Sequence, residues 1–275
     1  MWPALSPSAG LLVPVFLELF AGVGGLSKQI AAHGNLVLSW DIAFGSNYDL
    51  TVRSRRSMVL GWLRGGAIKG VHLGTPCQTL TRARDHGPGP PPLRSNEHPM
   101  GLPVLQRPGD RVALELGNIL LRFSASVVAT ARMLGVGASI ENPASSRLWI
   151  CPPVLRLLQK RDVSLSTTEF CMFGMQWRKS TSFLHVHVDL SRIGDMRCLG
   201  ARRGLCKRTG RPHRILSGKT PEGTFWTKIA EPYPVALCKM LALAWEDHWR
   251  SERAQQLAEL IFPALGIQAA KPSNA

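Results

Sequence analysis

The chain has 275 residues, of which 45% are hydrophobic and 19% charged, and its formal net charge at neutral pH is +15. This composition excludes a disordered chain, and the length suits one α/β domain with a small addition rather than two full domains. The excess of Lys and Arg favours a polyanionic partner, of which nucleic acid is the simplest.

The first twenty residues are apolar but lack a basic start and a small-residue cleavage site, so we do not expect a signal peptide. Without a secretory signal, the six scattered cysteines are expected to be reduced thiols rather than a disulfide framework. We therefore expect an intracellular monomer with no membrane partner, located in the nucleus if the organism is eukaryotic.

The first predicted strand covers Val13 to Leu19 and runs into the glycine-rich turn Phe20-Ala21-Gly22-Val23-Gly24-Gly25, which opens a helix through Ala32. Such a turn lets the backbone approach a nucleotide-like ligand closely. A second strand, Leu36 to Asp41, ends in an acid at the place where doubly wound folds hold a ribose hydroxyl. Asp41 is therefore the ribose candidate.

A helical pattern over Arg53 to Gly65 leads to a third strand, Ile68 to Leu73. Directly after this strand comes Gly74-Thr75-Pro76-Cys77-Gln78. A side chain just past the carboxyl end of a strand lies in the crevice where open α/β sheets place their chemistry, which makes Cys77 a candidate nucleophile. The position would also suit a small buried residue in a turn, since free cysteine is often buried.

The segment from Thr79 to Pro108 is rich in proline and arginine and shows little periodicity, so we expect a mobile basic loop. The longest helical pattern follows, from Asp110 to Leu134, and is expected to be mostly core. The next apolar strand, Ala138 to Pro143, carries the carboxylate of Glu141 close to its end.

The last third of the chain begins with a helix predicted over Ser145 to Lys160, interrupted at Pro152 and Pro153. Extended chain through Phe170 and a strand over Phe183 to Val188 should follow.

The region from Ser191 to Ile229 is glycine-rich and strongly basic, and a helix is predicted over Tyr233 to Trp249. The tail after Lys271 should fray. We predict a catalytic domain over residues 1–190, a short basic segment over 191–231, and C-terminal helices over 232–275 that pack back on the catalytic domain.

Three motifs, in this order, resemble the cytosine-5 DNA methyltransferases: Phe20-Ala21-Gly22-x-Gly24-Gly25, Pro76-Cys77-Gln78 and Glu141-Asn142. The segment Gly174 to Thr181, with Gln176 and Arg178, resembles the glutamine–arginine motif of this family. The resemblance implies a doubly wound, Rossmann-like, mostly parallel α/β sheet of the S-adenosylmethionine-dependent methyltransferase fold, with a small basic appendage that reads the target.

The resemblance also implies the chemistry. Cys77 would add to carbon 6 of cytosine, Glu141 would meet the ring's nitrogen edge, and Arg178 would hold the carbonyl oxygen or a phosphate, with Gln78 as a further catalytic candidate. The residues implied at S-adenosylmethionine are Phe20, Ala21, Gly22, Gly24, Gly25, Asp41, Asp49 and Pro76. Because carbon 6 lies inside a stacked duplex, the target base would have to be flipped out.

Two other functions stay open. A catalytically inactive nucleic-acid-binding module is favoured by Ser180, where the family usually carries a second arginine, and by Thr75, where it often carries a second proline. The same chemistry on RNA is equally compatible with base flipping.

A metal site is the last question that the sequence raises. Cys198, Cys206 and His213 have the side chains of zinc ligands, and Cys171 or His187 would complete a set of four. Their spacing lacks the paired short gaps of common zinc sites, so we assign no metal ligand from the sequence.

Overall fold

The computed structural model describes residues 13–85, 90–198 and 204–264. Its centre is a six-stranded sheet in the order β2-β1-β3-β4-β6-β5. The strands are β1 (Val15–Leu19), β2 (Val37–Trp40), β3 (Ile68–Gly74), β4 (Gly137–Pro143), β5 (Val163–Glu169) and β6 (Ser180–Val186). Strands β2, β1, β3 and β4 pair in parallel, whereas β6 runs antiparallel to both β4 and β5.

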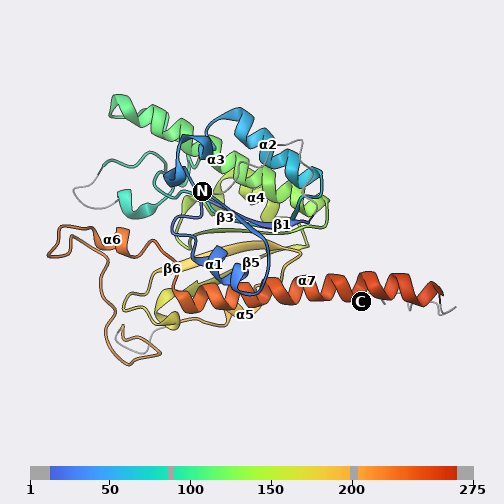
Figure 1. The fold of residues 1–275 in the computed structure, drawn as a ribbon. Coiled ribbons are helices and arrows are strands. Elements are labelled where there is room, and N and C mark those ends of the chain that lie inside the picture. The colour runs from blue at the N-terminus through green and yellow to red at the C-terminus, as the bar shows by residue number, and fades with distance from the viewer. Residues whose placement is uncertain (1–12, 86–89, 199–203, 265–275) are drawn as a thin grey trace.

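Helices cover both faces of the sheet (Figure 1). One face carries α2 (Arg53–Arg64), α3 (Pro108–Met133) and α4 (Pro152–Leu158), and the other carries α1 (Gly25–Ala32), α5 (Ser191–Gly194) and α7 (Val235–Ala264). The short helix α6 (Trp226–Ile229) lies in a segment that extends away from the sheet. The predicted doubly wound, Rossmann-like, mostly parallel α/β fold is confirmed.

Short 3-10 turns connect several of these elements: η1 (Ile42–Phe44), η2 (Ser46–Tyr48), η3 (Arg82–Asp85), η4 (Arg147–Ile150) and η5 (Phe170–Phe173). The helix predicted over residues 145–160 is divided into η4 and α4. Pro152 causes the division, since its ring cannot donate a backbone hydrogen bond within a helix but fits the first helical turn.

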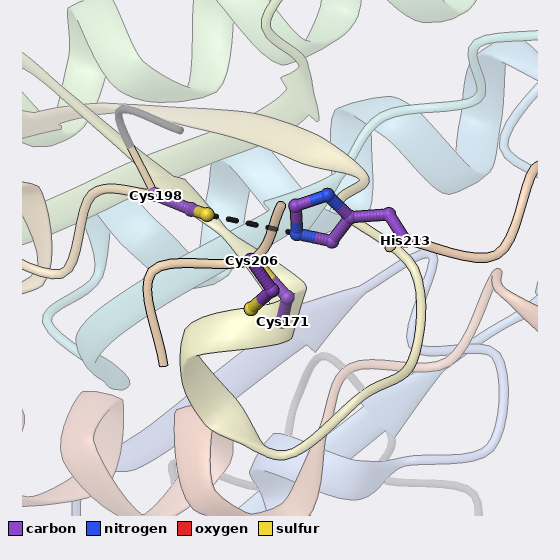
Figure 2. A group of neighbouring side chains, drawn as sticks. All are labelled: Cys171, Cys198, Cys206 and His213. Atoms are coloured by element: carbon purple, nitrogen blue, oxygen red, sulfur yellow. Dashed lines mark hydrogen bonds between the residues drawn. The ribbon is translucent and has the colours of Figure 1, made fainter. Parts of the chain in front are cut away.

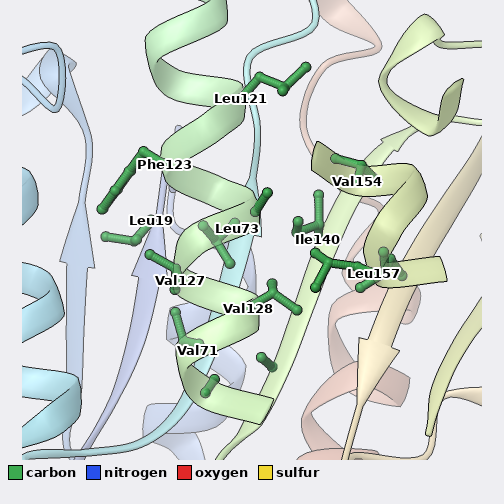
Figure 3. Close-up of a cluster of buried hydrophobic side chains, with 14 of the residues drawn as sticks. Leu19, Val71, Leu73, Leu121, Phe123, Val127, Val128, Ile140, Val154 and Leu157 are labelled. Atoms are coloured by element: carbon green, nitrogen blue, oxygen red, sulfur yellow. The ribbon is translucent and has the colours of Figure 1, made fainter. Parts of the chain in front are cut away.

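The core between the sheet and α3 explains why the central strands form (Figure 3). Leu19, Leu73 and Ile140 come from three parallel strands and pack with Val127 and Val128 of α3, all of them fully buried. Strands covered on both faces carry continuous apolar runs, as β1 does. Each such side chain contributes about 1.5–3 kcal/mol when fully buried.

On the opposite face, α7 approaches the sheet closely because two paired strand residues lack side chains. Gly70 of β3 and Gly137 of β4 are register partners. A Cβ atom would lie 2.9 Å from the Trp245 ring at Gly70 and 2.7 Å from it at Gly137. The Trp245 ring also meets Phe16 of β1 edge to face, with 5.0 Å between centroids. These contacts fix α7, which continues to Ala264 rather than ending near the predicted Trp249.

The loop from residue 79 to 108 departs from the prediction at Arg94. We expected a mobile basic loop, but the Arg94 side chain is 1% exposed. Its guanidinium donates to the Thr79 carbonyl oxygen at 3.0 Å, the Pro99 carbonyl oxygen at 2.8 Å and Asn118 Oδ1 of α3 at 2.8 Å. Arg94 therefore fastens the loop to α3, because a buried guanidinium requires acceptors for its fixed fork of donors.

One helix, α3, is long and apolar. By length and mean hydropathy, α3 would be able to cross a membrane, although 39% of its most apolar window is buried inside the protein. The start of the chain, the tail after Lys271, and the basic pair Arg202 and Arg203 lie outside the described residues.

Candidate active site

The candidate site lies at the carboxyl ends of β1, β3 and β4. The chain leaves β1 for β2 on one side and returns to β3 on the other, so the crevice between β1 and β3 is the topological switch point of the sheet. Ligands of open α/β sheets bind at such a point. Parallel pairing places Gly74 of β3 opposite Glu141 of β4, which brings the predicted nucleophile and the predicted acid to the same edge.

The glycine-rich turn after β1 has left-handed backbone at three positions. Phe20, Gly22 and Gly24 have positive φ angles of 57°, 54° and 65°. A Cβ atom on Gly22 would meet nothing within 4 Å, so the space in front of the turn is open. The turn then enters α1 at Gly25. This open, left-handed backbone is suited to a ligand that approaches the main chain closely.

Asp41 connects this turn to the end of β2. Its Oδ2 accepts a hydrogen bond from the Gly22 backbone N–H at 2.8 Å, and its Oδ1 accepts one from the Ala43 N–H at 2.8 Å. A carboxylate has about four acceptor positions, so two remain for ribose hydroxyls.

Asp49 is the second predicted acid near the cofactor. Its Oδ1 accepts hydrogen bonds from the backbone N–H of Thr51 at 2.8 Å and from the Thr51 hydroxyl at 2.7 Å. Both acids thus shape the loops that would surround the cofactor.

Cys77 lies three residues beyond the end of β3 in a tight turn. Its carbonyl oxygen accepts from the N–H groups of Leu80 and Thr81, both at 2.8 Å. The side chain is half-buried, and the following residue, Gln78, is exposed. Burial raises the pKa of the Cys77 thiol, the charge of Glu141 raises it further, and the ammonium of Lys179 opposes both effects. The thiol therefore keeps its proton in the free protein at neutral pH.

Glu141 is held by two hydroxyl groups from other parts of the chain. The residue is 7% exposed. The Tyr233 hydroxyl donates to Oε2 at 3.1 Å, and the Thr181 hydroxyl of β6 donates to Oε1. Neither partner was identified from the sequence, although Tyr233 stands out between Pro232 and Pro234 just before α7.

A buried chain of hydrogen bonds continues behind Tyr233. His72 Nε2 lies 3.1 Å from the Tyr233 hydroxyl, and His72 Nδ1 lies 2.8 Å from the Ser139 hydroxyl. Complete burial lowers the pKa of His72 to about 3, so the imidazole is neutral. The Tyr233 hydroxyl donates to Glu141, so its oxygen accepts a hydrogen bond from His72. We therefore assign the His72 proton to Nε2, with the Ser139 hydroxyl donating to Nδ1. These groups fix the orientation of the Glu141 carboxyl.

Arg178 and Gln176 lie at the same edge but are engaged elsewhere. Arg178 is 50% exposed, and its Nη2 is 3.7 Å from Oε1 of the fully buried Glu169. The Gln176 carbonyl oxygen accepts from the Arg214 backbone N–H at 2.9 Å. Glu169 also accepts from the Cys198 N–H at 2.7 Å. This segment therefore joins the basic segment to the edge of the sheet.

Comparisons with known proteins place few constraints on this chain. No protein-family model and no curated protein matches it. One solved structure that it resembles is the methyltransferase EhMeth of Entamoeba histolytica, with a TM-score of 0.38 and 10% identity. The match covers 74% of this chain and 58% of that protein's chain.

Proposed function

We propose that this protein transfers a methyl group from S-adenosylmethionine to carbon 5 of cytosine in DNA, with Cys77 as a covalent nucleophile. The observation that carries the proposal is the pairing of a half-buried thiol and a buried, doubly hydrogen-bonded carboxyl at the ends of adjacent parallel strands. An open glycine turn lies at the end of the next strand, β1.

Cys77 and Glu141 have complementary tasks in this reaction. The Cys77 sulfur forms a bond to carbon 6 while electron density moves toward carbon 5 and the nitrogen edge of the ring. Glu141 offers a carboxyl to that edge, and Tyr233 with Thr181 keeps it in place. Because the Cys77 pKa is raised, the thiol must lose its proton as the complex forms, and the nearby Lys179 ammonium favours the thiolate.

The residues around the glycine turn fit the cofactor. Gly22 leaves open space against the main chain, and Asp41 retains free acceptor positions for ribose hydroxyls. S-adenosylmethionine would supply the methyl group as an electrophile when bound there. Pro76, which directly precedes Cys77, would border the donor on the other side of the crevice.

DNA is the proposed partner because a net charge of +15 favours a polyanion. Attack on carbon 6 also requires a base that is flipped out of its stack. RNA offers the same ring and the same backbone charge, so it is the alternative substrate. An inactive binding module is the second candidate function. It is favoured by Arg178, which lies against Glu169 with half of its side chain in solvent.

The test uses duplex DNA, single-stranded DNA and transfer RNA whose cytosines carry fluorine at carbon 5. After methyl transfer the fluorine cannot leave as a proton would, so the protein should stay covalently joined to its substrate on a denaturing gel. Cys77→Ser should lose the adduct, since a serine hydroxyl is far less ionised than a thiol. Cys151→Ser is the matched control, because Cys151 is a buried thiol outside the site.

The gel separates the candidate functions. An adduct with DNA that requires both Cys77 and S-adenosylmethionine supports the proposal. An adduct confined to transfer RNA would show that RNA is the substrate. An adduct that survives Cys77→Ser overturns the nucleophile. Binding without any adduct supports the inactive module.

A further inference from the structure

Four potential metal ligands meet at the edge of the basic segment, away from the proposed site. The ligand atoms of Cys171, Cys198, Cys206 and His213 all lie within 4.8 Å of one another. Figure 2 shows their side chains converging from the η5 turn and from the segment that follows α5. The three cysteines are buried, with exposed fractions of 3% or less, and none of them forms a disulfide.

The geometry is close to that of a tetrahedral zinc site. Zinc–sulfur bonds of about 2.3 Å and zinc–nitrogen bonds of about 2.0–2.1 Å place neighbouring ligand atoms about 3.6–3.8 Å apart. The distance between Cys198 Sγ and His213 Nε2 is 3.6 Å. The remaining pairs need to contract by at most about 1 Å, which side-chain rotation supplies.

Local backbone structure holds two of the ligands in position. The Cys206 N–H donates to the Arg211 carbonyl oxygen and the Gly210 N–H donates to the Cys206 carbonyl oxygen, both at 2.8 Å. Gly210 has a φ of 66°, which favours glycine in this tight loop. An antiparallel bridge pairs Leu205 with Pro212, so Cys206 and His213 lie diagonally across it.

The surroundings favour thiolates. The Lys207 backbone N–H donates to Cys198 Sγ at 3.3 Å, the kind of outer contact that orients a metal-bound sulfur. Arg208 Nε donates to the Cys171 carbonyl oxygen at 2.6 Å, which keeps its positive charge beside the cluster. Three thiolates, a neutral imidazole and Zn²⁺ carry a net charge of −1, and such cations offset it.

Packing of three thiols as small apolar side chains is the simpler explanation of the cluster. It does not account for the imidazole nitrogen aimed at Cys198 Sγ, nor for the small amount of apolar burial nearby. Between residues 204 and 225, large side chains such as Ile215 and Phe225 are 81% and 56% exposed. A segment with so little core requires another source of stability, and a structural metal is one.

We propose that Cys171, Cys198, Cys206 and His213 bind one structural Zn²⁺ ion. Four protein ligands leave no open position, so the ion has a structural role rather than a catalytic one. The ion links η5, at the end of β5, to the basic segment. It thereby fixes Arg197, whose Nε lies 3.2 Å from Glu169. The assignment holds whether or not the protein transfers methyl groups, because it uses none of the proposed catalytic residues.

The first test is metal analysis of the full-length protein, purified without chelators and passed through a desalting column. We expect about one zinc per chain in the wild type and in the Cys151→Ser and Cys238→Ser controls. Cys206→Ser and His213→Ala should lose most of it. A wild type without zinc that also fails to take up added Zn²⁺ overturns the proposal, as does unchanged zinc content in both cluster variants.

If the cluster variants fail to fold, a second measurement on the wild type still tests the proposal. Replacement of the ion by Co²⁺ should give the intense visible bands and sulfur-to-metal charge transfer of a tetrahedral thiolate site. A chelator should at the same time make three additional thiols reactive toward a disulfide reagent. Absence of these bands, or mass spectrometry showing a disulfide within the cluster of the freshly purified protein, contradicts the assignment.

Discussion

The proposed active-site edge and the basic segment are built in opposite ways. At the edge, backbone pairing sets the positions: β3 and β4 run in register, and Cys77 and Glu141 follow from where those strands end. In the basic segment, the described residues form two short helices, α5 and α6, and isolated bridges such as Lys219 with Phe225, but no strand of the sheet. Register sets the geometry of the first region, whereas the proposed zinc ion on three thiols and His213 would set that of the second.

Burial differs in the same way. The strands below the edge are covered on both faces, so side chains there are close to fully buried. In the basic segment, Arg214 stacks on the half-buried Trp226 ring at 4.2 Å and Lys219 lies over the exposed Phe225 ring at 4.9 Å. Such cation–π contacts are worth about 0.5–1 kcal/mol at exposed sites. Because its strands are buried on both faces, the proposed active-site edge should withstand changes that loosen the basic segment.

The largest effect is expected at Glu141. Glu141→Gln keeps the shape of the side chain but cannot transfer a proton, so methyl transfer should slow by about 10²–10⁴-fold. Cofactor affinity should stay the same, because Glu141 is held by Tyr233 and Thr181 rather than by the glycine turn. Single-turnover kinetics and calorimetry measure the two quantities. A variant with the wild-type rate would remove Glu141 from the chemistry.

A smaller effect is expected at Glu18, which lies in β1 below the glycine turn. Burial raises the pKa of its carboxyl to about 7 from 4.5, although hydrogen bonds from Ser27 oppose this shift. Between these pH values the unfolded chain has released a proton that the folded protein keeps, so the free energy of unfolding falls as pH rises through this window. The total loss is up to about 3 kcal/mol and stays constant above the window.

Urea unfolding at several pH values measures this dependence. Glu18→Gln should flatten it and raise the stability at pH 8, since Gln is never charged and retains an acceptor for Ser27. If the variant keeps the wild-type slope between pH 4.5 and 7, the carboxyl is not the group that holds the proton, and the sheet below the turn is less dry than the burial implies.

Substitution of Gly70 tests how closely α7 packs on the sheet. Gly70→Ala places a Cβ atom 2.9 Å from the Trp245 ring, and such overpacking typically costs about 1–3 kcal/mol. Gly61→Ala is the matched control, because Gly61 lies in α2 with nothing within 4 Å of an added Cβ. There alanine should stabilise the helix by about 0.4–1 kcal/mol. Equal stabilities for the two variants would mean that α7 yields to the added methyl group.

The smallest effect is expected on the surface of the basic segment. Lys207 and Arg211 are exposed, and replacing both with alanine should reduce the slope of log affinity against log salt by about 2, or about 0.9 for each lost phosphate contact. Fluorescence anisotropy with labelled duplex DNA measures the slope. Zinc content should not change, because neither side chain is a proposed ligand. An unchanged slope would place the phosphate contacts elsewhere.

The amino-acid sequence by itself determined the elements whose causes are local. Continuous apolar runs predict buried strands, the glycine turn predicts a backbone that a ligand can approach closely, and a residue directly after a strand is at its carboxyl end. For this reason Gly22, Asp41, Cys77 and Glu141 all lie at the predicted edge of the sheet. The role assigned to each of them stays a prediction.

Only the tertiary structure decided the contacts between distant parts of the chain. Tyr233 meets Glu141 across 92 positions of sequence, and Arg94 of the predicted mobile loop is buried and donates to Asn118. Cys171 joins Cys198 and His213, whereas His187 instead meets the Arg132 carbonyl oxygen at 3.0 Å. No short-range pattern encodes such pairs, because they depend on how helices and loops pack on the finished sheet.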